Sequence, residues 1–426
     1  MLDINLIRTN PDAARNALRK RNMNVGFVDD FLALDTRWRA ITKALDEARR
    51  GLNEFSKARN IEEAKKVKET VKQLEQEINA IEPERATMID RLPNIPAETV
   101  PVGKSEEENV VLREVGERTS ARKDYLTIAE EFDLIDTKRS AKVSGSRFGY
   151  LKGPFALLEF ALTKFAMDTL VPEGFIPVIP PVMIKPEPYR RMGRLAGDQK
   201  EERYHLEKDD LYLVGSAEHT IGPMHMDEVF EEKELPRRYV GFSTCFRREA
   251  GSYGKDTKGI FRVHQFDKVE MFAFTKPEDS EREHQFLLSL QEKMMRKLGL
   301  PYRVVEVCTG DMGFTDAKQY DIEVWLPSEN RYRETHSCSN TTDFQARGIN
   351  ARYRANGKSP SLDESRRGGQ SANRTEYVHM LNATVFSQRP LIAILENCQT
   401  KKGTIKIPKV LQKYVGIKEI KKTDAK

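Results

Sequence analysis

The segment from residue 246 to residue 270 constrains the fold of this chain most, because it has the pattern of two strands joined by a loop. Successive side chains of a strand point to opposite faces of a sheet. The second strand, predicted over 261–274, therefore has a charged face of Arg262, His264, Phe266, Lys268 and Glu270 and an apolar face of Phe261, Val263 and Val269. The first strand, predicted over 239–249, likewise groups Cys245, Arg247 and Glu249. We interpret the two charged faces as the lining of one pocket; a solvated hairpin with cross-strand ion pairs is the alternative.

A second feature is a charged, helix-favouring stretch at about 31–92, in which apolar residues recur at spacings of three and four. One stripe consists of Leu34, Trp38, Ile41, Leu45, Ala48, Leu52 and Phe55, and a second of Val67, Val71, Leu74, Ile78 and Ile81. The break between them, at 56–62, predicts an antiparallel two-helix coiled coil. At about 1.5 Å per residue each helix is roughly 35–45 Å long, so we expect a projecting arm and not a pair packed flat on the protein. Pro83 is expected to bend the second helix.

The stretch from 92 to 111 is rich in proline and acidic residues, which is typical of a linker. We therefore predict two domains. The first, residues 1–111, contains the arm and the linker, and the second, residues 112–426, contains short strands with separate helices at 157–170, 280–298 and 390–399. This order predicts an α+β fold, an antiparallel sheet flanked by helices.

Composition excludes several classes of protein. The chain has no apolar run long enough for a membrane span and no apolar leader at its start, so we expect a cytoplasmic protein. Its four cysteines are far apart and form no C-x-x-C pair. The net charge of +5 permits a polyanionic partner without requiring one. The sequence contains no GxxxxGK[ST], GxGxxG or HExxH motif, so the common nucleotide and metal motifs do not explain the charged pocket.

The segment FRREAGSYGKDTKGIFRVHQFDKVE resembles the strand-loop-strand motif of class II aminoacyl-tRNA synthetases, in the form seen in seryl-tRNA synthetases. The resemblance continues in order through the helical arm, LPNIP, GSAEH, YRETHSCSNTTDFQAR and HMLNATVFSQRPLIAILEN, and covers nearly the whole chain. It implies an antiparallel sheet flanked by helices, and a homodimer whose interface includes the 157–181 region.

The resemblance also implies an ATP site. Arg247 would bridge the α-phosphate and the substrate carboxylate, and with Arg262 and Arg389, which would hold the triphosphate, it would form the catalytic set. Glu249 would bind the adenine amino group and Phe266 would stack on the base. Further ATP-site residues are Arg248 and Val263, and Glu334 and Ser337 would hold Mg²⁺. These last two are three residues apart and cannot share a strand face by parity, so we expect a bulge between them.

For the amino acid, the resemblance implies that Ser216, Ala217 and Glu218 bind the ammonium end, and that Glu270 and Thr384 bind the side-chain hydroxyl. Two departures from the family pattern are present. Ser216 stands where the family usually has threonine. The 382–389 segment lacks the family's glycines and is a residue shorter, which leaves the register of Thr384 open.

The implied activity is a ligase that activates L-serine with ATP and transfers it to the 3′ end of tRNA(Ser), with tRNA(Sec) as a further candidate. The arm would bind the tRNA through its basic residues, Lys43, Arg49, Arg50, Lys57, Arg59, Lys65, Lys66 and Lys68, although each also fits a solubilising flank of a coiled coil. Two alternatives stay open: an enzyme of the same fold that charges a carrier protein with another small amino acid, and a non-catalytic RNA-binding paralogue.

Overall fold

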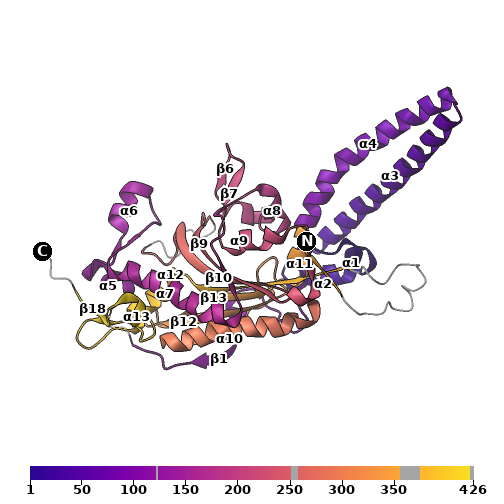
Figure 1. The fold of residues 1–426 in the computed structure, drawn as a ribbon. Helices are drawn as coiled ribbons and strands as arrows, with labels where there is room; N and C mark the ends of the chain where they lie inside the picture. Colours follow the sequence, from indigo (N-terminus) through magenta and orange to yellow (C-terminus); the bar gives the residue numbers. More distant parts are fainter. Residues whose placement is uncertain (121–122, 251–257, 356–374, 423–426) are drawn as a thin grey trace. The chain divides into compact units, whose positions relative to one another are not determined.

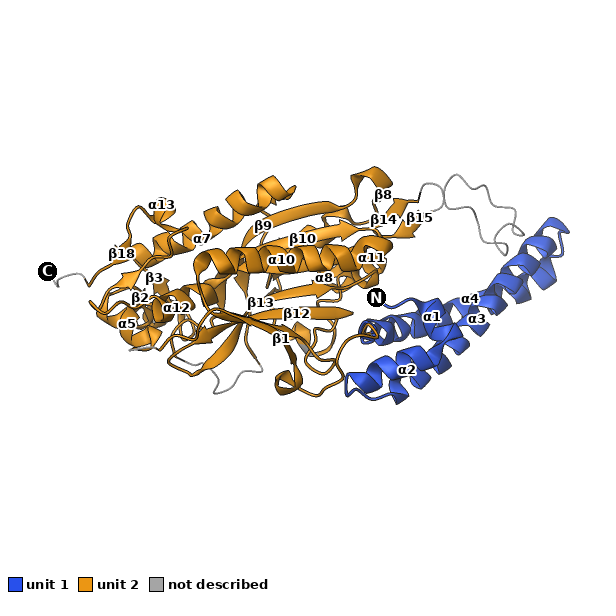
Figure 2. Cartoon of the chain, turned by 90° about the horizontal axis from the view of Figure 1, so that it is seen from below, with its two compact units in different colours: residues 1–95 blue, residues 96–426 orange. Residues whose placement is uncertain are grey.

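The computed structural model describes residues 1–426 except 121–122, 251–257, 356–374 and 423–426. The loop of the strand-loop-strand motif therefore lies largely outside the described residues. The chain divides into two compact units, Met1–Ile95 and Pro96–Lys426 (Figure 2). This division falls inside the linker predicted over 92–111, and β1 (Val110–Val115), which spans residue 111, pairs with a strand of the second unit.

The first unit consists of four helices, among its described residues: α1 (Ile4–Thr9), α2 (Pro11–Lys20), α3 (Gly26–Lys57) and α4 (Ile61–Asp90). The helices α3 and α4 form the predicted antiparallel hairpin, which confirms the coiled-coil arm (Figure 1). The turn is shorter than the predicted break, because Asn60 accepts a hydrogen bond from the backbone N–H of Glu63 and starts α4 at once. At the base of the hairpin, the buried carboxylate of Asp35 binds both Arg8, at 2.7 Å, and Arg85, at 2.9 Å.

The second unit is built on a sheet that has eight strands among the described residues, and every neighbouring pair except β4–β9 is antiparallel. In spatial order the strands are β1, β11 (Tyr302–Glu306), β12 (Lys318–Leu326), β13 (Arg331–Asn340), β16 (His379–Phe386), β10 (Gln265–Thr275), β9 (Arg237–Phe246) and β4 (Ile176–Val178). Together with its flanking helices, this sheet confirms the α+β prediction.

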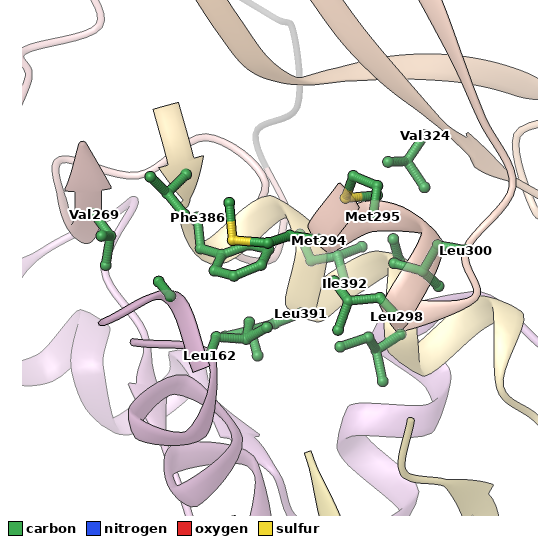
Figure 3. Packing of buried hydrophobic residues seen from close by; sticks show 14 of the residues in the cluster. Leu162, Val269, Met294, Met295, Leu298, Leu300, Val324, Phe386, Leu391 and Ile392 are labelled. Atoms are coloured by element: carbon green, nitrogen blue, oxygen red, sulfur yellow. The ribbon is translucent and has the colours of Figure 1, made fainter. Parts of the chain in front are cut away.

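Helices cover both faces of this sheet (Figure 1). One face packs against α7 (Pro154–Leu170), α10 (Ser280–Leu298) and α12 (Gln388–Asn397), whose apolar side chains meet those of the strands in a large core. Figure 3 shows Met294 and Met295 of α10 and Leu391 of α12 in this core. The other face packs against α8 (Pro186–Arg191), α9 (Glu218–Ile221) and α11 (Phe344–Ile349).

Smaller elements complete the second unit. The short sheets are β5 (Met183–Ile184) with β7 (Leu211–Leu213) and β6 (His205–Leu206); β15 (Thr375–Tyr377) with β14 (Arg352–Arg354) and β8 (Val229–Glu231); β17 (Ile405–Lys406) with β18 (Glu419–Ile420); and β2 (Ile135–Asp136) with β3 (Tyr150–Leu151). The remaining α-helices are α5 (Tyr125–Glu131), α6 (Thr137–Ser144) and α13 (Gln412–Val415). No helix in the described part of the chain has the length and apolar character that crossing a membrane requires.

The strands β9 and β10 are shorter than predicted at the ends that meet the loop. Strand β9 ends at Phe246, and β10 begins at Gln265, so Arg247 and Arg262 lie outside the strands. The ladder continues for one bond, from the N–H of Arg247 to the carbonyl of His264, and then stops because the N–H of His264 donates to Arg147. Strict alternation of faces therefore fails before Gln265, and Phe261 and Val263 line the same cavity as Arg262.

Candidate active site

A cavity of about 190 Å³ lies where β9 and β16 end and β10 begins, beside the middle of β13. Most of the residues predicted for the ATP site line it, together with one residue predicted for the amino acid: Arg247, Glu249, Arg262, Val263, Phe266, Glu334, Ser337, Thr384 and Arg389. The structure therefore brings together side chains from segments more than 140 residues apart in the sequence. The cavity adjoins a larger one of about 680 Å³, with which it shares Phe261, Arg262, Glu334 and Arg389.

Two arginine–carboxylate pairs lie in the wall of the cavity. Arg262 Nη1 is 2.7 Å from Glu249 Oε2, and Arg389 Nη1 is 2.9 Å from Glu334 Oε2. Arg389 also donates to the backbone carbonyl of Glu334. Desolvation by the surrounding protein would raise the pKa of Glu334. The positive charge and hydrogen bond of Arg389 outweigh this effect, and the pKa is lowered. An ionised carboxylate beside two guanidinium groups suits a polyphosphate that carries a hard cation.

The predicted bulge between Glu334 and Ser337 is present. Glu334 pairs with Glu323 and His336 pairs with Ile322, so Thr335 is the extra residue of β13. Its hydroxyl donates to the carbonyl of Ile322 at 3.1 Å. The bulge changes the parity of the strand, and both Glu334 and Ser337 consequently line the cavity.

A second bulge sets the strand register of Thr384. Val269 pairs with Phe386 and Glu270 pairs with Thr384, which leaves Val385 as the extra residue of β16. The hydroxyls of Thr384 and Ser337 are 3.3 Å apart. From the opposite face of the sheet, Gln291 of α10 donates to the carbonyls of Thr384 and Ser337 and fixes both strands at this point.

Arg247 is the link between the cavity and a buried polar group beside it. Its guanidinium lies 5.3 Å from the ring centre of Phe266, a cation–π contact inside the cavity. The same guanidinium donates to the backbone carbonyl of Gly215, directly before Ser216. Arg248 lies differently: its side chain packs over the ring of Tyr204, and it does not line the cavity.

The buried polar group contains the residues predicted for the amino acid. Ser216, Glu218 and Glu270 are all nearly inaccessible to solvent. Ala217 is fully buried in the apolar cluster beneath them, so only its backbone can contribute to a ligand site. Within this group, two carboxylate oxygens have neither a hydrogen bond nor an ion pair: Oε2 of Glu218 and Oε1 of Glu270. Buried acceptors without donors point to a small ligand that supplies N–H and O–H groups.

The two carboxylates differ in charge environment. Burial would raise the pKa of Glu218, but Arg194, 2.6 Å away, and His219 hold it well below its usual range. Burial lowers the pKa of His219 to about 3, so the ring is neutral at pH 7. Burial raises the pKa of Glu270 to about 7, although Lys268, whose Nζ lies 2.6 Å from Oε2, lowers it.

Sequence reasoning placed Lys268 on the face that lines the pocket but gave it no role there, and it missed Arg194 as part of the site. Strand parity had placed Lys268 on the same face as Glu270, which was the available signal. Arg194 follows α8 and reaches Glu218 only through the tertiary fold, so no local pattern indicates it. Among the residues that the structure describes, no group of three or more His, Cys, Asp or Glu side chains could hold a metal ion by itself.

A mainly antiparallel sheet whose strand ends carry arginines and carboxylates around one cavity defines a class II aminoacyl-tRNA synthetase core. Residues 203–398 match the family described as the tRNA synthetase class II core domain (G, H, P, S and T), and residues 1–96 match the seryl-tRNA synthetase N-terminal domain. The chain belongs to the seryl-tRNA synthetase family, which confirms the resemblance seen in the sequence.

Similar proteins extend over the full chain. The serine--tRNA ligase of Methanocella arvoryzae is 44% identical over 97% of this chain and 99% of its own length, and that of Dictyoglomus turgidum is 40% identical over 99% of each. The crystal structure of seryl-tRNA synthetase from Pyrococcus horikoshii complexed with ATP has a TM-score of 0.89 and 39% identity, with all of both chains covered. The cytoplasmic serine-tRNA ligase from Naegleria fowleri in complex with AMP has a TM-score of 0.85 and 35% identity, with 100% of this chain and 99% of its own covered.

Proposed function

We propose that this protein is a serine--tRNA ligase, which activates L-serine with ATP to seryl-adenylate and transfers the seryl group to the 3′ end of tRNA(Ser). The observation that carries the proposal is the pair of buried carboxylates, Glu218 and Glu270, with unpartnered oxygens beside Arg247. Serine supplies an ammonium and a hydroxyl that can donate to these carboxylate oxygens, and a carboxylate that can bind Arg247. The full-length relatives named serine--tRNA ligase support the same conclusion.

In the first step the serine carboxylate attacks the α-phosphorus, an oxygen–phosphorus bond forms, and the bond to the departing pyrophosphate breaks. A free α-carboxyl group titrates at about 3.5, so this nucleophile is already ionised and needs no general base. Arg247 neutralises the carboxylate and the α-phosphate and holds them in line. Arg262 and Arg389 stabilise the negative charge that develops on the pyrophosphate.

ATP would occupy the 190 Å³ cavity, with its base on Phe266 and its amino group at Glu249. A Mg²⁺ ion would be held by Glu334 and Ser337, because the bulge presents one carboxylate and one hydroxyl beside the predicted phosphate site. Magnesium usually takes only one or two protein carboxylates and completes its shell with phosphate oxygens and water. When bound, the ion supplies additional neutralisation of the triphosphate charge.

In the second step a hydroxyl of the terminal adenosine of the tRNA attacks the activated carbonyl, an ester forms, and AMP leaves. The proton of that hydroxyl passes to a phosphate oxygen or to water. We assign His264 a structural role, which the 3.0 Å contact between its Nδ1 and the carbonyl of Arg247 supports. His336 is buried, and burial lowers its pKa to about 4, so the His336 ring is neutral at pH 7.

The first unit, with the arm α3–α4, would bind the tRNA, and tRNA(Sec) is a further candidate substrate. Basic side chains along the arm, among them Lys43, Arg49 and Lys66, are exposed. Each of these three pairs with a neighbouring glutamate at the helix surface. Such exposed pairs contribute little to stability and can exchange a carboxylate for a phosphate.

We also propose that the enzyme is a cytoplasmic homodimer with an interface that includes the 157–181 region. Large apolar side chains are exposed along α7 and the chain around β4, namely Leu157, Phe160, Val171, Ile176 and Ile179. Strand β4 is at the edge of the sheet. An exposed apolar patch beside an open edge strand favours association with a second copy.

The test is ATP–pyrophosphate exchange with a panel of amino acids, followed by tRNA charging. We expect exchange with serine only, and serine esterified to tRNA(Ser). Exchange with a different small amino acid would indicate the carrier-protein alternative. A protein that binds tRNA but gives no exchange with any amino acid would be the non-catalytic paralogue.

A further inference from the structure

Lys268 lies between Glu270 and Ser216 in the buried polar group. Its ammonium is 2.6 Å from Glu270 Oε2 and donates to the hydroxyl of Ser216 at 3.2 Å. Its side chain is only 10% exposed, and it lines the cavity beside Thr384. A lysine buried to this degree is costly unless it is paired, so its position is fixed by these contacts.

We propose that Lys268 is a positioning residue that makes the hydroxyl-binding end of the serine site electrically neutral, so that it accepts a hydroxyl and rejects a cationic side chain. The inference rests on the proposed function. A buried carboxylate alone binds a cation most strongly, because a cation offsets its lost hydration. Lys268 is a built-in cation on one oxygen of Glu270, and Oε1 is left as an acceptor for one hydrogen bond.

The other two ends of the site have different charges. At the ammonium end, Arg194 and, more weakly, Arg203 keep Glu218 ionised, and its Oε2 is left as a negatively charged acceptor. At the carboxylate end, Arg247 supplies a positive charge. The three ends thus match the three polar groups of serine: acidic for the ammonium, neutral for the hydroxyl and basic for the carboxylate.

This arrangement has a consequence for pH dependence. The charged and titratable groups that interact with Glu270 are Lys268 on its own strand, Glu218 on α9, Cys245 on β9, Arg247 after β9, Arg194 after α8 and Cys338 on β13. Lys268 and Arg247 favour the ionised form of Glu270, and Glu218 opposes it. Removing the charge of Lys268 raises the pKa of Glu270 further, because burial then acts with less compensation.

The experiment compares Lys268→Met and Lys268→Gln with the parent and with Lys268→Arg. Lys318→Met is the matched control, since Lys318 is also about a tenth exposed and pairs with Glu281 and Glu306, and it does not line either cavity. The readouts are the pH profile of kcat/KM for serine in pyrophosphate exchange, and the preference for serine over 2,3-diaminopropionate, which replaces the hydroxyl by an ammonium.

For both neutral variants we expect KM for serine to rise by about tenfold, with a smaller change in kcat. The rising limb of the pH profile should move by about one unit to higher pH. The preference for serine over 2,3-diaminopropionate should fall by about tenfold or more. Lys268→Arg should keep KM for serine, the pH limb and the preference for serine close to those of the parent. Lys318→Met should behave like the parent.

The outcomes separate the two claims. If the parent shows no exchange with serine, the proposed function is wrong and the role of Lys268 is wrong with it. If the parent is active and the neutral variants keep its pH limb and its preference for serine, the role of Lys268 alone is refuted, whatever their overall rate. Lys268→Gln, which can still donate to Ser216, decides the question if Lys268→Met does not fold.

Discussion

Arg262 and Glu249 are joined by an ion pair of 2.7 Å across the mouth of the loop between β9 and β10. The family resemblance implies roles for these residues at opposite ends of one nucleotide, Arg262 at the triphosphate and Glu249 at the adenine. Arg389 and Glu334 repeat the relationship at 2.9 Å, with one residue assigned to phosphate and the other to Mg²⁺. With these assignments, each guanidinium would exchange a carboxylate for a phosphate when ATP binds, and the two pairs would tune the affinity for ATP.

Glu249→Gln separates these two contributions. The amide keeps a carbonyl that can accept from the adenine amino group but removes the charge that competes for Arg262. A charged hydrogen bond contributes about 1.5–3 kcal/mol, so we expect KM for ATP to change by about tenfold or less for Glu249→Gln, and to rise by much more for Glu249→Ala. Pyrophosphate exchange at varied ATP measures both. Equal KM values for the two variants would contradict a hydrogen bond from Glu249 to the base.

Glu270→Ala tests the recognition of the serine hydroxyl. A site that hydrogen-bonds a substrate hydroxyl can reject the analogue without it by up to about 10⁴-fold. We expect Glu270→Ala to lose most of its preference for serine over alanine in pyrophosphate exchange. Glu270→Gln is the control for size, because it keeps the volume and one acceptor. A variant that still selects serine over alanine as well as the parent does would show that Glu270 has been assigned wrongly.

The parts of this enzyme that sequence predicts are those set by local patterns. The arm follows from apolar residues three and four apart, and the bulge in β13 follows from the need for Glu334 and Ser337 to meet. The predicted ends of β9 and β10 at the loop were wrong. The carbonyl of Arg147, far away in sequence, accepts the hydrogen bond from the N–H of His264 and ends the ladder. Arg194 was not predicted for the same reason. Its guanidinium reaches Glu218 only because α8, which precedes it in the chain, packs against α11.

Shortening the arm tests its role in tRNA binding. Arg49 of α3 and Glu75 of α4 form an ion pair of 2.9 Å across the hairpin, so residues 50–74 can be replaced by a short glycine turn at a point where the helices already lie side by side. The base with Asp35 is left intact. We expect serine-dependent pyrophosphate exchange close to that of the parent and tRNA charging reduced by about tenfold or more. Unchanged charging at low tRNA concentration would refute the role of the arm.

The buried carboxylate of Asp35 predicts an acid-sensitive first unit. Burial would raise its pKa, but Arg8 and Arg85 outweigh burial and lower the pKa below the usual 3.8. A group with a lowered pKa in the folded state stabilises the fold above about pH 4 and loses that contribution as the pH falls. Asp35→Asn should reduce the free energy of unfolding of this unit by about 3 kcal/mol at pH 7, because two guanidinium groups lose their partner. Thermal unfolding of the parent and of Asp35→Asn at pH 7 and pH 3 measures this loss of stability. The difference in stability between the two proteins should be smaller at pH 3.

Replacing exposed apolar residues by aspartate tests the proposed dimer. Phe160 on α7 and Ile179 after β4 are 68% and 86% exposed in the single chain. Large apolar side chains with this exposure are expected where a second subunit covers them. Aspartate at both positions would place two charges in a desolvated contact, so we expect the double variant to sediment as a monomer when the parent sediments as a dimer. Val143→Asp on α6 is the matched control, because Val143 is 72% exposed but lies outside the 157–181 region. If the parent is a monomer, or if the double variant remains a dimer while folded, the interface does not lie on this surface.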